Sequence, residues 1–185
     1  MNWNRHSTLE GQHAFLSASK HSWIRYSDEK VADAYRKFLA VQKGTELHDL
    51  ASRCIKNGIK LQNRPATTLS LFVNDAIGFK MESEQVLYYS MNAFGTTDAI
   101  SFKNNVLRIH DLKTGEIKAS MEQLYIYAAL FCLEYHVKPG DIKIITRIYQ
   151  DNDFFEEEPD ATVIAPIMDR IITADKIINK YREEM

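Results

Sequence analysis

The chain has 185 residues, of which 45% are hydrophobic and 26% charged, and its formal net charge is −2. This balance excludes a disordered or low-complexity chain, and the length predicts a single domain over residues 1–185. No apolar run is long enough to cross a membrane, and the N-terminus lacks the pattern of a secretory signal. We therefore expect a soluble protein of the cytoplasm.

The charge is unevenly distributed along the chain. Residues 1–64 carry 11 basic and 6 acidic side chains, whereas residues 151–160 carry six acids and no base. A basic body with one acidic loop is compatible with a polyanionic ligand, but a solvated surface with a charged loop is the simpler explanation. The two cysteines, Cys54 and Cys132, fit a reducing compartment and are too few for a four-cysteine zinc or iron–sulfur site.

The first third of the chain has the residue spacing of helices. Ser27 precedes two acids and is a candidate N-cap, and the apolar residues that follow recur at i, i+4, i+7 and i+8. Gly44 is expected to end this helix. A second helix is predicted over residues 45–57, with Leu50 among its buried positions, and a third helical pattern ends near Gly78.

The middle of the chain changes to the composition of β-strands. Three segments rich in β-formers and separated by turn residues predict an antiparallel meander. These segments are residues 85–91, 96–102 and 106–113. An apolar helix over residues 120–135 then leads to a fourth strand over residues 141–149. Because a helix connects them, the third and fourth strands are expected to run parallel.

The end of the chain holds the acidic segment 151–160, predicted as a loop, and a final helix with Pro166 near its start. Taken together, the elements predict an α/β (α+β) fold with a central mixed sheet of about four to five strands flanked by helices. The helices are concentrated in the N-terminal third.

Two aspartates stand in the predicted sheet. Asp98 lies within the second strand, and Asp111 and Lys113 share one face at the end of the third. If these strands pair through the turn at residues 103–105, the two carboxylates become neighbours, which destabilises a sheet unless a cation lies between them. A hard divalent metal resolves that conflict. The alternatives are a plain surface ion pair of Asp111 with Lys113, or a shifted register in which both acids face water.

Three further polar residues accompany the helices. His48 leans toward the apolar stripe of the second helix, where a packing role is more common than a metal ligand. Gln123 and Tyr127 project from one face of the apolar helix. A capping box with Ser120 is a sufficient structural explanation of Gln123, and Tyr127 fits a core aromatic whose hydroxyl reaches the rim.

The order and spacing of four segments carry more information than any one of them. These segments are Gly44–His48, Gly95–Asp98, Asp111–Gly115 and Gln123–Tyr127. Together they resemble the RecB-like branch of the PD-(D/E)XK nuclease superfamily, which includes lambda-type phage exonucleases and CRISPR-associated exonucleases. The segment Leu16–Ser19 is similar to the start of many members, so the resemblance spans about residues 16–150.

The resemblance implies a restriction-endonuclease-like core and a role for each of seven residues. His48, Asp98 and Asp111 are the implied metal ligands with the Leu112 carbonyl as a further donor, Lys113 is the implied catalytic lysine, and Gln123 and Tyr127 are implied to support the active site and touch the DNA strand. The implied cofactor is Mg²⁺ or Mn²⁺, without an iron–sulfur cluster. Whether one or two metal ions act stays open.

The expected function is that of a metal-dependent DNA nuclease, an exonuclease at DNA ends, serving DNA recombination, repair or processing. Phage origin, and with it the host cytoplasm and a recombination-protein partner, follows from the family's distribution. Two alternatives stay open: a non-catalytic module that binds nucleic acid or a partner, and a structure-specific endonuclease. Basic residues in the first third are candidates for phosphate contacts, namely Lys20, Arg25, Arg36, Lys37 and Lys43.

Overall fold

The computed structural model describes residues 14–115 and 119–184. The chain divides into two compact units, Met1–Thr45 and Glu46–Met185, and each is described by itself. No helix of the described part is both long and apolar enough to span a bilayer.

The first unit is helical. A short 3-10 segment, η2 (Ala18–Arg25), precedes the long helix α1 (Asp28–Lys56), of which residues 28–45 belong to this unit. The Ser27 hydroxyl accepts a hydrogen bond from the backbone N–H of Lys30 (3.3 Å), as expected of an N-cap. Three aromatic rings pack together where the segment before η2 contacts α1. They belong to Phe15, Tyr35 and Phe38, with centroids 5.1–6.0 Å apart.

Helix α1 continues through Gly44, so the predicted helix end there is wrong. Glycine in a helix interior costs only about 1 kcal/mol relative to alanine, which does not outweigh the hydrogen bonds of the turns on either side. The helix ends where predicted, because Gly58 adopts φ +65° and donates its N–H to Ile55. Leu50, predicted to be buried, is 40% exposed.

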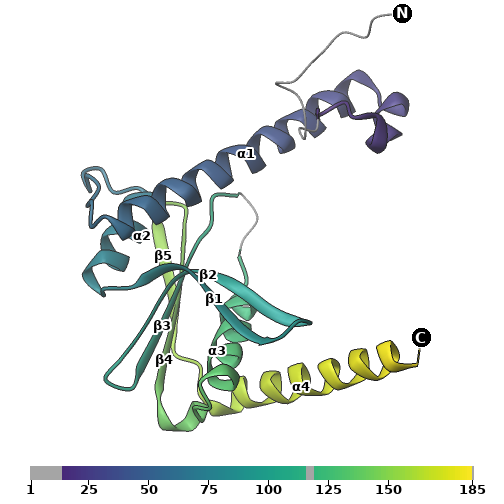
Figure 1. The fold of residues 1–185 in the computed structure, drawn as a ribbon. Helices are drawn as coiled ribbons and strands as arrows, with labels where there is room; N and C mark the ends of the chain where they lie inside the picture. The colour runs from purple at the N-terminus through teal and green to yellow at the C-terminus, as the bar shows by residue number, and fades with distance from the viewer. Residues whose placement is uncertain (1–13, 116–118, 185) are drawn as a thin grey trace, which may run out of the picture. The chain divides into compact units, whose positions relative to one another are not determined.

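The second unit is built on a five-stranded mixed sheet in the order β1-β2-β3-β4-β5 (Figure 1). Its strands are β1 (Glu82–Ser90), β2 (Ala93–Lys103), β3 (Val106–Leu112), β4 (Lys143–Gln150) and β5 (Asp153–Glu157). The first three form the predicted antiparallel meander, and β4 runs parallel to β3, as expected. The predicted fold class is therefore confirmed.

The acidic segment was predicted as a loop, but half of it forms the edge strand β5, antiparallel to β4. Gln150 pairs with Asp153, and the two residues between them have positive φ, the conformation that a type I′ hairpin turn requires. The aromatic pair Phe154–Phe155 favours a strand, while the acids lie on an exposed edge where they remain hydrated.

Helices cover both faces of the sheet. On one face lie α2 (Thr68–Gly78) and the end of α1, whose core includes Phe72 and Ala51 packed with Leu112. On the other lie α3 (Glu122–Glu134) and α4 (Ala161–Glu183), joined to the sheet through residues such as Leu124 and Ile164. A 3-10 turn, η3 (Pro139–Asp141), leads into β4. Because side chains alternate along a strand, neighbouring residues of β3 enter different environments.

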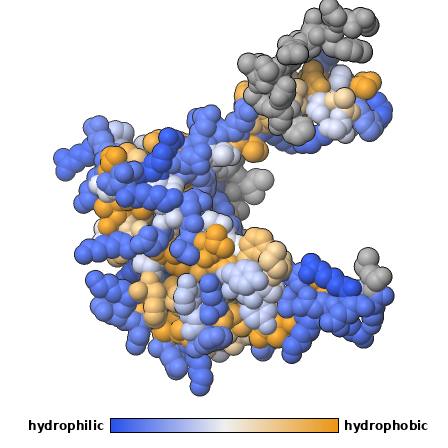
Figure 2. Space-filling model, viewed as in Figure 1, coloured by the Kyte–Doolittle hydropathy of each residue, from blue (hydrophilic) through white to orange (hydrophobic). Residues whose placement is uncertain are grey.

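Only the first half of α4 joins the core. Ile167 and Ile171 pack against it, whereas Ile177 and Ile178 in the second half are 49% and 40% exposed. Pro166 lies in the second turn of the helix, close to the start as predicted. Figure 2 shows that the outer part of α4 is mostly hydrophilic in this view. Its Asp175 accepts hydrogen bonds from the side chains of Ser90 (2.6 Å) and Asn92 (2.8 Å), so polar contacts join this half of the helix to the β1–β2 turn.

Candidate active site

The two aspartates of the sheet stand at corresponding positions of neighbouring strands. Ala99 and His110 form the last pair of the β2–β3 ladder, and Asp98 and Asp111 are the next residues along each strand. Both carboxylates point to the face covered by α3, since Ile100 and Ile109, two residues from each, belong to the core on that side. The register that the sequence analysis required is therefore present.

Asp98 connects strand β3 to helix α1. One carboxylate oxygen, Oδ2, accepts the backbone N–H of Leu112 (2.8 Å), and the other, Oδ1, lies 3.3 Å from Nδ1 of His48. The hydrogen bond to Asp98 raises the pKa of His48 above its ordinary value, against the opposing effect of burial, and the charges of Asp98 and Asp111 add to the increase. The higher pKa favours the protonated form of His48, in which the ring is a cationic partner of the carboxylates.

Asp111 is the most deeply buried acid of the site, with only 2% of its surface exposed. Burial raises the pKa of this carboxyl, and the negative charge of Asp98 raises it further, while Lys113 and His48 lower it. The ammonium of Lys113 lies 2.9 Å from Oδ2 of Asp111. Apart from this ion pair, Oδ2 has no hydrogen-bond partner within the described residues.

A chain of hydrogen bonds fixes Lys113 between α3 and the sheet. Its Nζ donates to Oε1 of Gln123 (2.8 Å), and Nε2 of Gln123 donates to the hydroxyl of Tyr127 (3.1 Å). That hydroxyl donates in turn to the carbonyl of Thr96 (2.7 Å) on β2. A Cβ atom at Gly95 would lie 2.9 Å from the Tyr127 ring, so the glycine of this segment is needed for the close approach.

Gln123 is therefore a member of the site and not of a helix cap. The Ser120 hydroxyl accepts the backbone N–H of Glu122 (3.2 Å), while the Gln123 amide is directed to Lys113 and Tyr127. The capping-box explanation of Gln123 is wrong, because the side chain of a capping glutamine must reach back to the N-cap backbone.

Glu84 is a residue of this region that sequence reasoning missed. Its neighbours Ser83 and Gln85 pair with residues 99 and 97 of β2, which places Glu84 opposite Asp98. Its φ of +56° is unusual within a strand. Burial and the charge of Asp98 raise its pKa. The strand predicted from the sequence began at Gln85. Glu84 therefore lay outside it, and its pairing position opposite Asp98 was not considered.

The donor atoms at this place suit a hard divalent cation. Carboxylate and carbonyl oxygens are the ligands that Mg²⁺ prefers, and the buried Oδ2 of Asp111, which faces Lys113 but has no hydrogen-bond partner within the described residues, is a ligand atom of this kind. In residues 14–115 and 119–184, however, no three His, Cys, Asp or Glu side chains are already grouped to hold an ion. The type of donor fits a metal, and binding would draw Asp98 and Asp111 together with a backbone carbonyl and water.

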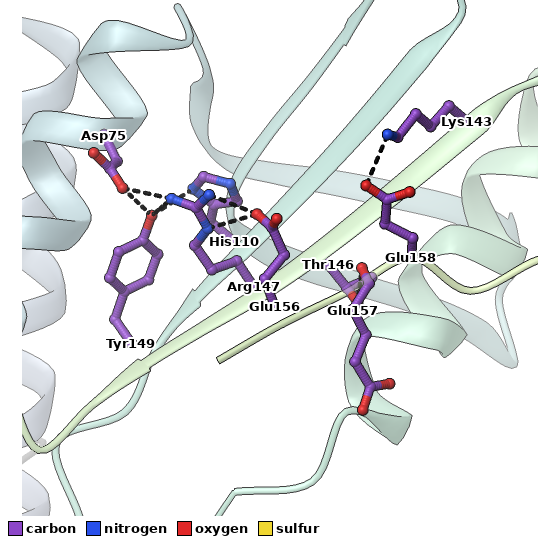
Figure 3. A network of polar contacts seen from close by, with 9 residues as sticks. All are labelled: Asp75, His110, Lys143, Thr146, Arg147, Tyr149, Glu156, Glu157 and Glu158. Atoms are coloured by element: carbon purple, nitrogen blue, oxygen red, sulfur yellow. Dashed lines mark hydrogen bonds and ion pairs between the residues drawn. The ribbon is translucent and has the colours of Figure 1, made fainter. Parts of the chain in front are cut away.

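A second polar cluster lies behind the site, on the face covered by α2 (Figure 3). The guanidinium of Arg147 lies 2.6 Å from Oδ2 of Asp75 and 2.5 Å from Oε2 of Glu156. The Tyr149 hydroxyl donates to the same oxygen of Asp75 (2.8 Å) and lies 3.2 Å from Nδ1 of His110, which is fully buried. This cluster touches the candidate site through the backbone, where the N–H of Lys113 donates to the carbonyl of Tyr149 (2.9 Å).

The basic residues predicted to contact phosphate all belong to the first unit and are exposed. They are Lys20, Arg25, Arg36, Lys37 and Lys43. Arg36 forms an ion pair with Asp33 (2.9 Å), which is a weak interaction at such exposure.

Comparison with protein-family models, with curated proteins and with solved structures finds no match to this chain. The resemblance to RecB-like nucleases therefore rests on the residues themselves, and the function follows as a proposal from their chemistry.

Proposed function

We propose that this chain is a metal-dependent DNA nuclease that hydrolyses phosphodiester bonds, acting as an exonuclease at DNA ends. The observation that supports it is the position of Lys113. Its ammonium is held between the buried carboxylate of Asp111 (2.9 Å) and the amide of Gln123 (2.8 Å), next to a second carboxylate, Asp98. If the ion pair of Lys113 with Asp111 served stability alone, the neighbouring Asp98 would be unfavourable, because like charges side by side destabilise a sheet.

The chemistry follows from charge. A phosphodiester is an anion that repels hydroxide, so its hydrolysis requires positive charge at the phosphate and an oriented water molecule. Lys113 provides an ammonium whose position is fixed by Gln123, able to orient water or to stabilise the negative charge that develops on the phosphate. Tyr127 and Thr96 restrain Gln123 in turn, so the donor is in place before substrate arrives.

The carboxylates have a separate task. Asp98, Asp111 and the carbonyl of Leu112 would hold Mg²⁺ or Mn²⁺, which polarises a phosphate oxygen and acidifies bound water when present. His48 lies 3.3 Å from Asp98 on the side of α1, and its neutral ring would be the further metal ligand that the resemblance implies. Glu84, opposite Asp98, adds an acid that a second metal position would require.

The wider setting belongs to the same proposal. DNA recombination, repair or processing, a recombination protein as partner, and the cytoplasm of a phage-infected host come with the resemblance stated from the four sequence segments.

The activity is tested with linear and covalently closed DNA in the presence of Mg²⁺ or Mn²⁺. We expect the linear DNA to be degraded and Lys113→Ala to reduce the rate by about 10²–10³-fold, the usual loss when one transition-state donor is removed. The matched control is Lys143→Ala, because Lys143 also forms an ion pair with an acid, Glu158 (2.7 Å), but on an exposed strand end. This control is expected to keep full activity.

The other outcomes have clear meanings. Full activity of Lys113→Ala contradicts the proposal. Equal cleavage of closed circles or branched DNA indicates an endonuclease. Salt-dependent DNA binding without cleavage in any metal indicates a non-catalytic module. Anomalous scattering from a Mn²⁺-soaked crystal tests the metal separately from activity, and we expect an ion between Asp98 and Asp111.

A further inference from the structure

A pocket of about 400 Å³ lies within the first unit, between η2 and the first turns of α1. This volume is in the range of about 300–1,000 Å³ that is usual for small-molecule sites. Its walls are formed by Ala14, Phe15, Ser17, Ser19, Lys20, Ser22, Trp23, Tyr26, Ala34 and Phe38.

The residues that line the pocket combine three kinds of chemistry. Four are aromatic, three are serines, and one, Lys20, carries a positive charge, while no acid is among the lining residues. Aromatic faces attract planar rings, and hydroxyl and ammonium groups bind phosphate oxygens. An apolar ligand would make no use of the Lys20 ammonium, and an acidic peptide would make little use of the rings.

The walls are held in place before a ligand binds. The indole N–H of Trp23 donates to the carbonyl of Ser17 (3.0 Å), and the Ser17 and Ser19 hydroxyls are 2.7 Å apart. On the other side, the Tyr26 hydroxyl lies 3.2 Å from that of Ser22. Because these groups are already ordered, binding loses less side-chain entropy than it would on a flexible surface.

The charge around the pocket is also favourable to an anion. Residues 14–45 contain six lysines and arginines and three aspartates and glutamates, although the chain as a whole is negative. Lys30, just outside the pocket, lies 4.4 Å from the centroid of the Tyr26 ring. A ligand that is both planar and anionic therefore matches this place in shape and in charge.

We propose that this pocket binds one nucleotide unit of a single DNA strand. The base would stack on the aromatic walls, as bases do in proteins that bind single strands, and the phosphate would contact Lys20 and the serine hydroxyls. The identification of the strand as DNA rests on the proposed nuclease function, whereas the capacity to bind a nucleotide follows from the pocket alone.

Trp23 reports directly on this pocket. The chain has two tryptophans, so a Trp3→Phe variant of the full-length protein leaves Trp23 as the only indole fluorophore. The protein is titrated in EDTA, where no metal-dependent cleavage takes place, with a deoxynucleoside 5′-monophosphate, a short single-stranded oligonucleotide and an abasic strand of equal length. We expect the oligonucleotide to quench or shift the Trp23 emission and the abasic strand to bind at least about tenfold more weakly.

Lys20→Ala and Lys176→Ala provide a matched pair, since both remove one exposed lysine and only Lys20 lines the pocket. We expect Lys20→Ala to weaken oligonucleotide binding about tenfold and Lys176→Ala to leave it nearly unchanged. Far-ultraviolet circular dichroism verifies that both variants keep the helical content of the parent.

Three results would overturn the assignment: an emission unchanged by the oligonucleotide, equal weakening in the two lysine variants, or binding of the mononucleotide alone. The first two reject a strand-binding pocket, and the third identifies a site for free nucleotides. Because the titration does not involve cleavage, a chain that degrades DNA but fails this test retains the nuclease proposal, and a chain that passes it without degrading DNA retains the pocket.

Discussion

The two polar clusters on opposite faces of the β3–β4 pair differ in how their charges are balanced. Behind the sheet, the single guanidinium of Arg147 lies between Asp75 and Glu156 and contacts both at 2.6 Å or less. In front, two acids stand side by side: Asp111 is buried and forms an ion pair with Lys113 (2.9 Å), and Asp98 lies beside it with His48 at 3.3 Å. In the rear cluster one guanidinium contacts both acids and holds them apart, whereas in the front cluster the two carboxylates are neighbours and Oδ2 of Asp111 has no hydrogen-bond partner within the described residues.

This difference shows what each cluster contributes. Fully paired polar groups make a core rigid and specific, and a functional site often retains an arrangement that is unfavourable for stability. The two are connected, because the backbone of Tyr149 in the rear cluster holds the backbone of Lys113 in the front one. We infer that the rear cluster fixes the end of β3 so that the front cluster can hold its charges in place.

The largest effect on stability is expected from Arg147→Met. The side chain of Arg147 is 12% exposed, and removing it leaves Asp75 and Glu156 without their shared partner. Because both acids retain access to water, we expect a loss of about 3 kcal/mol in the free energy of unfolding, at the lower end for a broken buried pair. Urea denaturation measures it. Arg108→Met is the control, since Arg108 stacks on Phe79 and should cost much less.

An intermediate effect on the free energy of unfolding is expected when the pH is lowered, because His110 is buried in its neutral form. Burial, with the nearby charges of Arg147 and Arg108, lowers the pKa of His110 to about 3. The Tyr149 hydroxyl donates to Asp75, so His110 must donate from Nδ1 to Tyr149, and its Nε2 has no partner in the described residues. A proton added to Nε2 would therefore have no acceptor.

The direction of the pH effect follows from this. The unfolded chain takes up the proton below about pH 6.5 and the folded chain does not, so the contribution of neutral His110 is complete above that pH and is lost toward pH 3. The loss should reach about 2 kcal/mol at pH 5. His48 titrates in the opposite sense, so the test is the difference between the profiles of the parent and His110→Phe. Parallel profiles would contradict this assignment.

Much of the fold was accessible from the sequence because local patterns determine it. Alternating β-formers and turn residues predict the meander, and a helical crossover makes β4 parallel to β3. The effect of Gly44 as a helix breaker was overestimated. The prediction considered the glycine alone and did not count the hydrogen bonds of the helical turns on either side of it. Strand β5 was missed because charge was taken as evidence for a loop, while its pairing depends on contacts with β4.

The candidate site was accessible to a similar degree. The register of Asp98 with Asp111 could be counted from the hairpin turn, and the helical spacing of Gln123 and Tyr127 placed them together. The role of Gly95 and the position of Glu84 depend on packing between elements distant in sequence, which no local pattern encodes. The same is true of the rear cluster, whose members come from α2, β3, β4 and β5.

The smallest and sharpest test is a pair of identical substitutions, one in each cluster. Asp111→Asn removes a buried carboxylate whose raised pKa shows that its charge is unfavourable there, so we expect the free energy of unfolding to rise by about 1 kcal/mol while nuclease activity is lost. Asp75→Asn removes a carboxylate that accepts hydrogen bonds from both Arg147 and Tyr149. This substitution should lower the free energy of unfolding by about 1 kcal/mol. Thermal or urea unfolding of both variants gives the signs. The same sign for both would mean that the two clusters serve stability alike, and the contrast between a structural and a functional face of β3 would be lost.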